Sequence, residues 1–494
     1  MLRTDLRLPL VRQVPMKDID FRVTGELRDA QSDRLVPGRV IAAPVLTVAA
    51  DPAQLRLSGA GTLGILPFDA AWTQPLGLAA EAGSRIEGRA TLDAAGLADL
   101  GVALPAGLVA GAGPATVTID LPRGAPPRLQ LSSDLTGLRL AIRELGWSKP
   151  AATPGRLDLT ADLGSPPRVD RLAIEAPGLS ARGRLTLRPG GGLDRATFDQ
   201  AVVGRWFQGG VVLTGQGAGR PPGIEITGGR LDLRAMPRTD GPRPRGPAGP
   251  PIPVRLDRLE VSDTIALTGL TGRFSRAGGL NGDFTARVNG AAAITGEVVP
   301  APGGSAIRIR SQDAGGVMAA AGIFARARGG VLDLTLTPGD TPGETMGDAR
   351  VTNLTVRDMP VLAALLNAIS VVGLIEQLNA QGLVFAEAQA RFRLIPEGVE
   401  IRRASAVGAS LGVSMEGIYD QARRRIRLQG VISPVYLLNG IGAILTRRGE
   451  GLFGFNYRVR GPVDAPEVSV NPLSILTPGM FRELFRGPAP QLGN

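Results

Sequence analysis

The chain has 494 residues, of which 43% are hydrophobic and 20% charged, so it is long and apolar enough to bury a core. It contains no cysteine and no histidine, which excludes disulfide frameworks, thiolate metal sites and the commonest general base near neutral pH. The formal charge of +10 comes almost wholly from scattered arginines, without the aromatic-lined basic groove that would indicate nucleic-acid binding.

Short runs in which apolar and polar residues alternate fill most of the chain. Its 68 glycines and 40 prolines separate these runs and are more than a helical protein usually contains. In a strand successive side chains point to opposite faces, so the alternation predicts antiparallel sheet with one apolar and one polar face. We therefore predict a mainly β protein, a long, twisted antiparallel sheet forming an open groove, with a few amphipathic helices near the C-terminal end.

The chain begins directly in this alternating pattern. Residues 1–25 lack the apolar core that a signal peptide requires. We therefore expect that Met1 begins a fragment of a longer protein. The next distinct feature is LDAAGLADLGV at residues 92–102, for which we predict a short helix.

A proline-rich segment at residues 238–253 interrupts the alternation. Proline and glycine at this density favour a loop over a strand. The predicted organisation is a β-rich groove segment at residues 1–237, a loop or linker at 238–253, and a second β-groove region with capping helices at 254–494.

The apolar positions of the alternating runs are the candidate residues that line the groove. ARFRLIPEGVEIRR, for example, reads as a hairpin with its turn at PEG. The candidate lining residues are Leu185, Leu187, Leu231, Leu233, Leu332, Leu334, Leu336, Phe392, Leu394, Val399, Ile401, Val413, Met415, Ile426, Leu428, Phe455, Tyr457 and Val459.

The most apolar stretch of the chain lies at residues 358–382. Asp358 is a suitable N-cap, Pro360 fits a first helical turn, and Gly382 fits the position after a helix end. The uninterrupted apolar part would span roughly 22 Å, less than the ~30 Å hydrocarbon core of a membrane. We predict a helix over residues 360–379 that is buried against the sheet and does not cross a membrane.

This helix is predicted to cap the C-terminal end of the groove. The side chains expected to do so are Leu362, Leu365, Leu366, Ile369 and Val372. A second capping helix is predicted near residues 436–445.

Enzymatic chemistry is not expected. GASLG at residues 408–412 matches the G-x-S-x-G pattern around Ser410, but the chain has no histidine to accept the serine proton. The scattered acidic residues show neither metal-ligand nor acid-base spacing. We predict no catalytic residues, no metal and no cofactor.

The C-terminal part of the chain resembles the AsmA family of large envelope proteins of diderm bacteria. The resemblance covers residues 351–480 and rests on the order of several local patterns. These are NLTVRDMPVLAALLNAISVVGLIEQLNAQG with the hairpin that follows it, ASAVGASLGVSMEGIYD, the FNYRVRG strand, and the ending PEVSVNPLSILTPG. The first 300 residues fit only through their alternating pattern.

The resemblance implies a periplasmic protein without enzymatic activity that carries phospholipid along an apolar β-groove between inner and outer membrane, in support of outer-membrane biogenesis. The implied partners are phospholipid, both membrane surfaces and other envelope proteins, with no nucleic acid. Members of the family have an N-terminal membrane helix, so this chain would be an N-terminally truncated member, anchored to the inner membrane through a segment that it lacks. The alternative is a structural or assembly scaffold of the envelope, whose β core is filled by its own side chains.

Overall fold

The computed structural model describes residues 2–7, 20–36, 38–102, 104–189, 191–217, 220–237, 249–341, 343–434, 454–463 and 465–476. The chain divides into two compact units, Met1–Arg243 and Pro244–Asn494. Most of the proline-rich segment, residues 238–248, lies outside the described residues.

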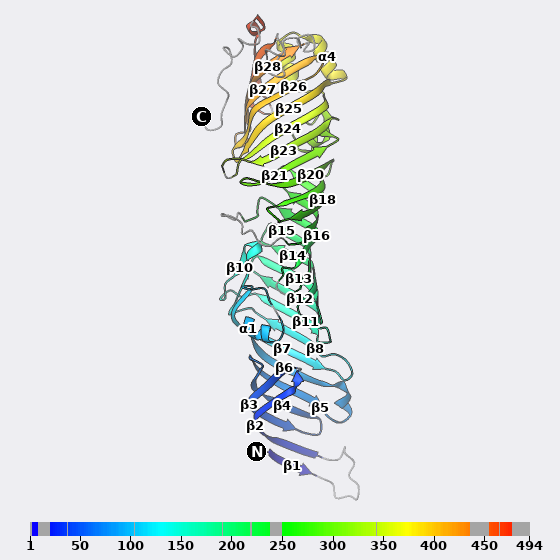
Figure 1. The fold of residues 1–494 in the computed structure, drawn as a ribbon, viewed down its shortest axis with the longest axis vertical. Coiled ribbons are helices and arrows are strands. Elements are labelled where there is room, and N and C mark those ends of the chain that lie inside the picture. The colour runs from blue at the N-terminus through cyan, green and yellow to red at the C-terminus, as the bar shows by residue number, and fades with distance from the viewer. Residues whose placement is uncertain are drawn as a thin grey trace. The chain divides into compact units, whose positions relative to one another are not determined.

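Unit 1 is an antiparallel sheet in which strands follow one another in chain order (Figure 1). The first eight strands are β1 (Leu2–Arg7), β2 (Asp20–Val36), β3 (Arg39–Ala50), β4 (Gln54–Leu63), β5 (Leu66–Pro75), β6 (Ser84–Asp93), β7 (Val109–Leu121) and β8 (Arg128–Ser133). β8 pairs with β11, and the sheet continues through β11 (Arg156–Asp162), β12 (Arg168–Ala176), β13 (Leu179–Leu187), β14 (Leu193–Val203), β15 (Phe207–Thr214) and β16 (Gly223–Asp232). The short strands β9 (Leu138–Ile142) and β10 (Trp147–Lys149) are inserted between β8 and β11; β9 pairs with the start of β7, and β10 pairs with β9.

Unit 2 repeats this arrangement with antiparallel neighbours. Its strands are β17 (Ile252–Glu260), β18 (Ala266–Ser275), β19 (Asn281–Val288), β20 (Ala292–Ala301), β21 (Gly304–Ser311), β23 (Val331–Pro338), β24 (Thr345–Val356), β25 (Leu383–Ile395), β26 (Gly398–Val407), β27 (Leu411–Asp420), β28 (Arg425–Pro434), β29 (Phe455–Pro462) and β30 (Glu467–Asn471). The two-residue β22 (Ala327–Arg328) pairs with the end of β24. The predicted hairpin at residues 390–403 is confirmed, because Ile395 pairs with Gly398 across a two-residue turn.

The predicted fold class is confirmed: the protein is mainly β, built of open, twisted, antiparallel sheet. Extra residues interrupt the register at several strand pairs, as between Thr160 and Ala161 or between Ile401 and Ala404. Such bulges bend a strand and increase its right-handed twist, so they curl the sheet.

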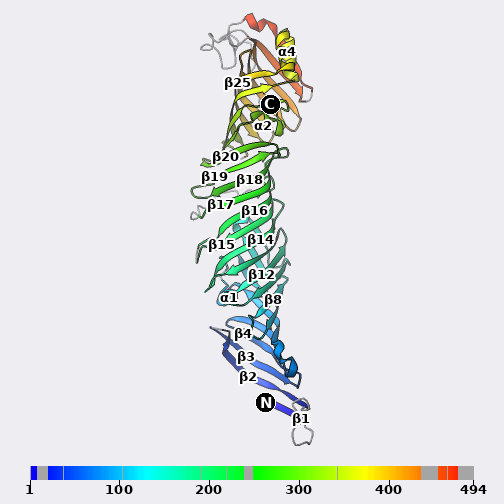
Figure 2. The same ribbon diagram turned by 90° about the vertical axis from the view of Figure 1, so that its right-hand side faces the viewer.

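Helices are few among the described residues. They are the α-helices α1 (Ala94–Asp99), α2 (Ala314–Ala320), α3 (Pro360–Ala368) and α4 (Val372–Ala380), and the 3-10 helices Gly77–Ala82, Arg143–Leu145 and Pro472–Leu476. The helix predicted at residues 92–102 is confirmed as α1, which begins at an Asp93 N-cap whose carboxylate accepts from the Gly96 N–H at 2.6 Å. α4 lies at the C-terminal part of unit 2 (Figure 2).

The prediction of one helix over residues 360–379 is wrong, because two helices occupy this stretch. Ser370 has a positive φ of 59°. The N–H of Ser370 donates to Asn367 at 3.0 Å and the N–H of Val371 donates to Leu366 at 3.2 Å, which closes α3 with the hydrogen bonds of a Schellman motif. Asp358 is not the N-cap, since Met359 holds that position and Asp358 pairs with Arg326. The helix predicted at 436–445 lies outside the described residues.

Candidate functional site

The apolar face of unit 2 is built from rows of side chains that the strand register aligns across the whole sheet. One row contains, in spatial order, Val254, Gly272, Phe284, Gly296, Ile309, Leu334, Ala349, Ala390, Ala404, Met415, Gly430, Tyr457 and Val470. The next row contains Ile252, Phe274, Gly282, Val298, Ile307, Leu336, Gly347, Phe392, Ile401, Gly417, Leu428, Val459 and Val468. Every strand except β22 contributes one residue to each row, and neither row contains a charged side chain.

The opposite face of the same strands is polar. On each strand, one residue separates the members of the two apolar rows, and its side chain points to the opposite face. These residues form a polar row that contains Arg273, Asp283, Glu297, Arg308, Thr335, Asp348 and Arg391. Its charges pair across strands, as where Arg391 Nε donates to Asp348 at 2.9 Å. Unit 2 is therefore an amphipathic sheet with one continuous apolar face.

The register brings the sequence-predicted lining residues of unit 2 to this one face. Leu334, Met415 and Tyr457 lie in the first row, and Leu336, Phe392, Ile401, Leu428 and Val459 lie in the second. Leu332, Val413 and Phe455 flank the rows on one side, and Leu394, Val399 and Ile426 flank them on the other.

Burial along the apolar face of unit 2 is uneven. Solvent reaches five side chains of this face, which are half-buried: Leu336, Phe392, Leu394, Ile401 and Met415. Leu332, Tyr457 and Val459 are only 5%, 4% and 1% exposed, and they belong to one apolar cluster with residues of α3 and α4. Towards its C-terminal end, the apolar face is therefore covered by the protein itself.

α3 supplies most of this cover. Leu362, Leu365 and Leu366 are buried in the cluster, and Ile369 packs against it from the end of the helix. Val372 was predicted to join them, but it is 64% exposed. The reason is the chain reversal at Ser370, which starts α4 on a new axis and turns Val372 outward.

Unit 1 has an apolar face of the same construction. One row contains Gly25, Val48, Leu57, Trp72, Ile86, Ile119, Leu129, Ala161, Val169, Leu185, Ala196, Leu213 and Ile224. A second row contains Gly59, Ala70, Gly88, Val117, Leu131, Leu159, Leu172, Gly183, Phe198, Val211 and Ile226. Of the predicted lining residues, Leu185 lies in the first row, Leu187 follows it on β13, and Leu231 lies opposite Phe207.

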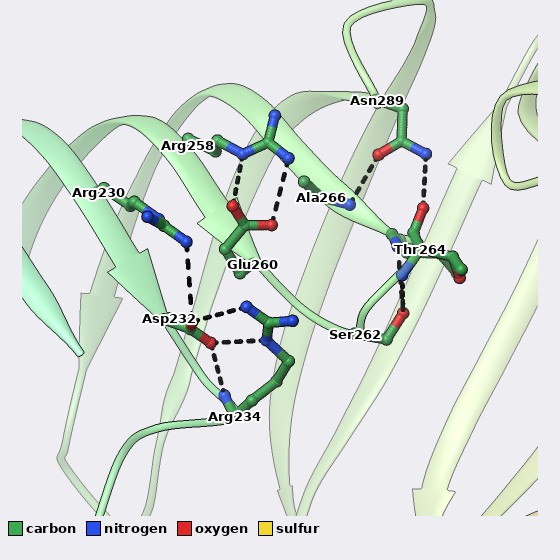
Figure 3. A network of polar contacts seen from close by, with 10 residues as sticks. Arg230, Asp232, Arg234, Arg258, Glu260, Ser262, Thr264, Ala266 and Asn289 are labelled. Atoms are coloured by element: carbon green, nitrogen blue, oxygen red, sulfur yellow. Dashed lines mark hydrogen bonds and ion pairs between the residues drawn. The ribbon is translucent and has the colours of Figure 1, made fainter. Parts of the chain in front are cut away.

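Leu233 does not belong to the sheet, which corrects the sequence prediction. β16 ends at Asp232, and Leu233 lies in the following turn with 43% of its surface exposed. The Asp232 carboxylate accepts from the Arg234 backbone N–H at 3.0 Å and from its guanidinium at 2.8 and 2.9 Å (Figure 3). This local turn competes with continued strand pairing and ends the strand.

The ion pair with Arg234 makes Asp232 sensitive to acid. The side-chain hydrogen bond from Arg234 is the main cause that lowers the pKa of Asp232 to about 2. Because this pKa lies below the ordinary value of about 3.9, the pair stabilises the fold above roughly pH 4 and loses that effect as the pH falls towards 2. We expect Asp232→Asn to flatten the pH dependence of urea unfolding between about pH 2 and 4. An unchanged slope in the variant would contradict this assignment.

Polar contacts in unit 2 fasten its turns. Asn289 accepts from the Ala266 N–H and donates to the Thr264 carbonyl oxygen, both at 2.8 Å (Figure 3). It also donates to the Ala320 carbonyl oxygen at 2.7 Å. Arg258 Nε donates to the buried Glu260 at 2.6 Å. We interpret these groups as structural, since Asn289 joins its turn to neighbouring segments and Arg258 pairs with Glu260 within β17.

Two segments pack on the apolar face of unit 1 and cover part of it. The sequence analysis did not predict this cover. α1 contributes Leu97 to a cluster with Ala90 and Ala115. Residues 134–155, which contain β9 and β10 and which we call the β9–β10 lobe, place Leu135 and Leu138 against Leu157 and Ile174 of the sheet. In each case the inserted segment follows a strand end at one lateral edge of the sheet.

Lys149 holds the β9–β10 lobe together. Its side chain is 1% exposed, and Nζ donates to the carbonyl oxygens of Leu135, Leu138 and Pro150 at 2.8, 2.7 and 3.1 Å. Burial lowers the pKa of the ammonium below its ordinary value. Sequence reasoning missed this residue, although its rarity was a signal, because Lys17 and Lys149 are the only lysines in the chain.

Other lining residues that sequence reasoning missed come from β17 to β21. Val254, Leu256, Phe284, Ile294 and Ile309 all point to the apolar face. The sequence did contain a signal for these residues. PVRLDRLE and SAIRIRS alternate apolar and polar side chains in the same way as the runs that supplied the candidate lining residues.

Neither a membrane span nor a metal cluster is found in the part of the chain that the structure describes. Each helix there is too short or too polar to cross a bilayer, and the acidic side chains there do not gather into a metal-binding group. Comparisons of the chain with protein-family models, with curated proteins and with solved structures give no match.

Proposed function

We propose that the apolar face of each unit binds the acyl chains of phospholipids, and that the protein transports lipid through the bacterial envelope without enzymatic chemistry. The observation that supports this proposal is the pair of uncharged rows that continue across the sheet of each unit. An alkyl chain in water costs ~0.8 kcal/mol per CH₂, which is more than 10 kcal/mol for a long chain. A surface that offers every CH₂ an apolar neighbour removes most of that cost.

Movement along such a surface needs no covalent step. Because successive strands present similar Leu, Val, Ile, Ala and Gly side chains, a chain shifted by one strand spacing of ~4.8 Å meets nearly the same surroundings. The barrier to each shift is therefore small compared with the cost of leaving the surface. The charged opposite face keeps the sheet wetted on its other side.

The location and partners are proposed from the resemblance of residues 351–480 to the AsmA family. On this proposal the protein works in the periplasm in association with the inner membrane, and exchanges phospholipid with the surfaces of the inner and outer membranes. Envelope proteins would be further partners.

A second candidate function is supported by the burial near α3. Leu366 is fully buried there, and Val459 is 1% exposed within the same cluster. If the protein's own side chains cover the whole apolar face as they do near α3, the apolar rows serve as an ordinary core. The protein would then be a structural or assembly scaffold of the envelope.

Native mass spectrometry of the protein purified from a diderm bacterium in mild detergent separates the two functions. Lipid transport predicts added masses that correspond to phospholipids and that are lost on extraction with organic solvent. Transfer of labelled phospholipid between vesicles should rise with protein concentration. The transport proposal would be overturned, and the scaffold favoured, if the protein isolated in the presence of phospholipid had the mass of the polypeptide alone and did not transfer lipid.

A further inference from the structure

Aromatic residues on the apolar faces lie opposite glycines. At six positions the register pairs an aromatic side chain directly with a glycine of the neighbouring strand. The pairs are Phe68 with Gly61, Phe198 with Gly183, Phe274 with Gly282, Phe284 with Gly296, Phe392 with Gly347, and Tyr457 with Gly430. Phe284 has a second glycine, Gly272, on its other side.

The rings reach across the neighbouring strand. A Cβ added at Gly347 would collide with the three outermost ring carbons of Phe392, and one added at Gly296 would do the same with Phe284. The far end of each ring therefore lies over the glycine Cα, which is possible only if the ring lies along the sheet. The Phe274 ring is stacked with the Phe284 ring and inclined to it by only 25°, with ring centroids 6.4 Å apart.

Tyr457 shows the same orientation by a hydrogen bond. Its hydroxyl donates to the Ser414 carbonyl oxygen at 2.9 Å. Tyr457 is on β29 and Ser414 is on β27, so the ring crosses β28 at Gly430 to reach its acceptor. The missing Cβ of Gly430 makes this crossing possible.

We propose that these glycine–aromatic pairs set the depth of the acyl-chain surface, with the flat rings as the floor on which a single alkyl chain lies; this inference rests on the proposed lipid-binding function. A ring that lies flat adds only about 3.5–4 Å above the sheet, which is one van der Waals layer. The same ring standing upright would fill the space that an alkyl chain needs. The half-buried rings of Phe68, Phe274 and Phe392 are the accessible members of this floor.

A purely stabilising role is the competing explanation, because an aromatic ring over a glycine also shields the exposed backbone. The two roles differ in what a raised ring does. If the ring only stabilises the sheet, a substitution that pushes it away from the sheet lowers the thermal midpoint and nothing else. If the ring is part of the floor, the same substitution also displaces lipid from protein that is still folded.

The test raises one ring and then removes it. Gly347→Ala forces the Phe392 ring off the sheet, and we expect phospholipid occupancy by native mass spectrometry to fall roughly three- to tenfold. Adding Phe392→Leu removes the collision, so the double variant should regain most of the lipid. Gly373→Ala is the matched control, since a Cβ at Gly373 meets nothing within 4 Å.

A photo-crosslinking residue provides a readout that does not depend on the stability of Gly347→Ala. A benzoylphenylalanine at Phe392 should crosslink to co-purified phospholipid, and one at the neighbouring Arg391, on the polar face, should not. Equal lipid in wild type and folded Gly347→Ala, or equal crosslinking from both positions, would overturn the floor proposal. Absence of lipid from the wild type itself would overturn the proposed function instead.

Discussion

Leu334→Glu is expected to strip phospholipid from the purified protein and to abolish its transfer between vesicles. Leu334 is half-buried in the first apolar row of unit 2, where Ile309 and Ala349 are its direct neighbours. A carboxylate there holds water on the surface and deprives about four CH₂ groups of a passing chain of apolar contact. The loss is about 3 kcal/mol, or roughly 150-fold in affinity.

The matched control is Thr335→Glu, which adds the same charge to the same strand on the opposite face. Thr335 is aligned with Arg308 and Asp348 in the polar row, where an added carboxylate meets charged neighbours and water. We expect this variant to keep its lipid and its thermal midpoint. Loss of lipid in both variants to the same extent would show that the face of the sheet is irrelevant, against the proposed function.

Leu428→Arg tests the same idea in the second row, between Gly417 and Val459. Its expected loss of lipid should resemble that of Leu334→Glu, because both place a charge on a half-buried position of the same face. A much smaller effect at Leu428 would indicate that the cover by α3 already closes this part of the face to lipid.

Lys149→Met is expected to lower the free energy of unfolding of unit 1 by roughly 2–4 kcal/mol. This is the largest effect on stability that we predict for a single substitution. Methionine keeps much of the apolar stem but leaves three carbonyl oxygens of the β9–β10 lobe without their common donor. Urea unfolding should report the lost free energy. Hydrogen exchange should show early opening of the segment around Leu135 and Leu138.

Arg139→Met is the control for Lys149→Met. Arg139 lies on β9 in the same lobe and is exposed, so its loss should change the free energy of unfolding by less than about 0.5 kcal/mol. If Lys149→Met were equally mild, the three carbonyl groups would be satisfied by water, and the lobe would not depend on the buried ammonium.

Much of the apolar face could be read from the sequence alone. The alternation around Leu332, Phe392 and Phe455 predicted both the strands and the face on which each of these side chains lies, and the register agrees. It succeeds because the two-residue period of a strand is a local property that holds whichever strand pairs with it. The prediction failed at Leu233, where the Asp232 turn ended the strand, and periodicity carries no information about that competition.

The sequence by itself thus determined that this protein is an amphipathic antiparallel sheet, from a chain that contains neither cysteine nor histidine. Only the tertiary structure decided how bulged strands align into uncharged rows, that Ser370 divides the capping helix, and that Lys149 fastens a lobe over the sheet. Each of these features depends on contacts between residues far apart in the chain or on one backbone reversal. The free energy of such contacts depends on residues that are distant in the sequence, and a short sequence pattern contains no information about them.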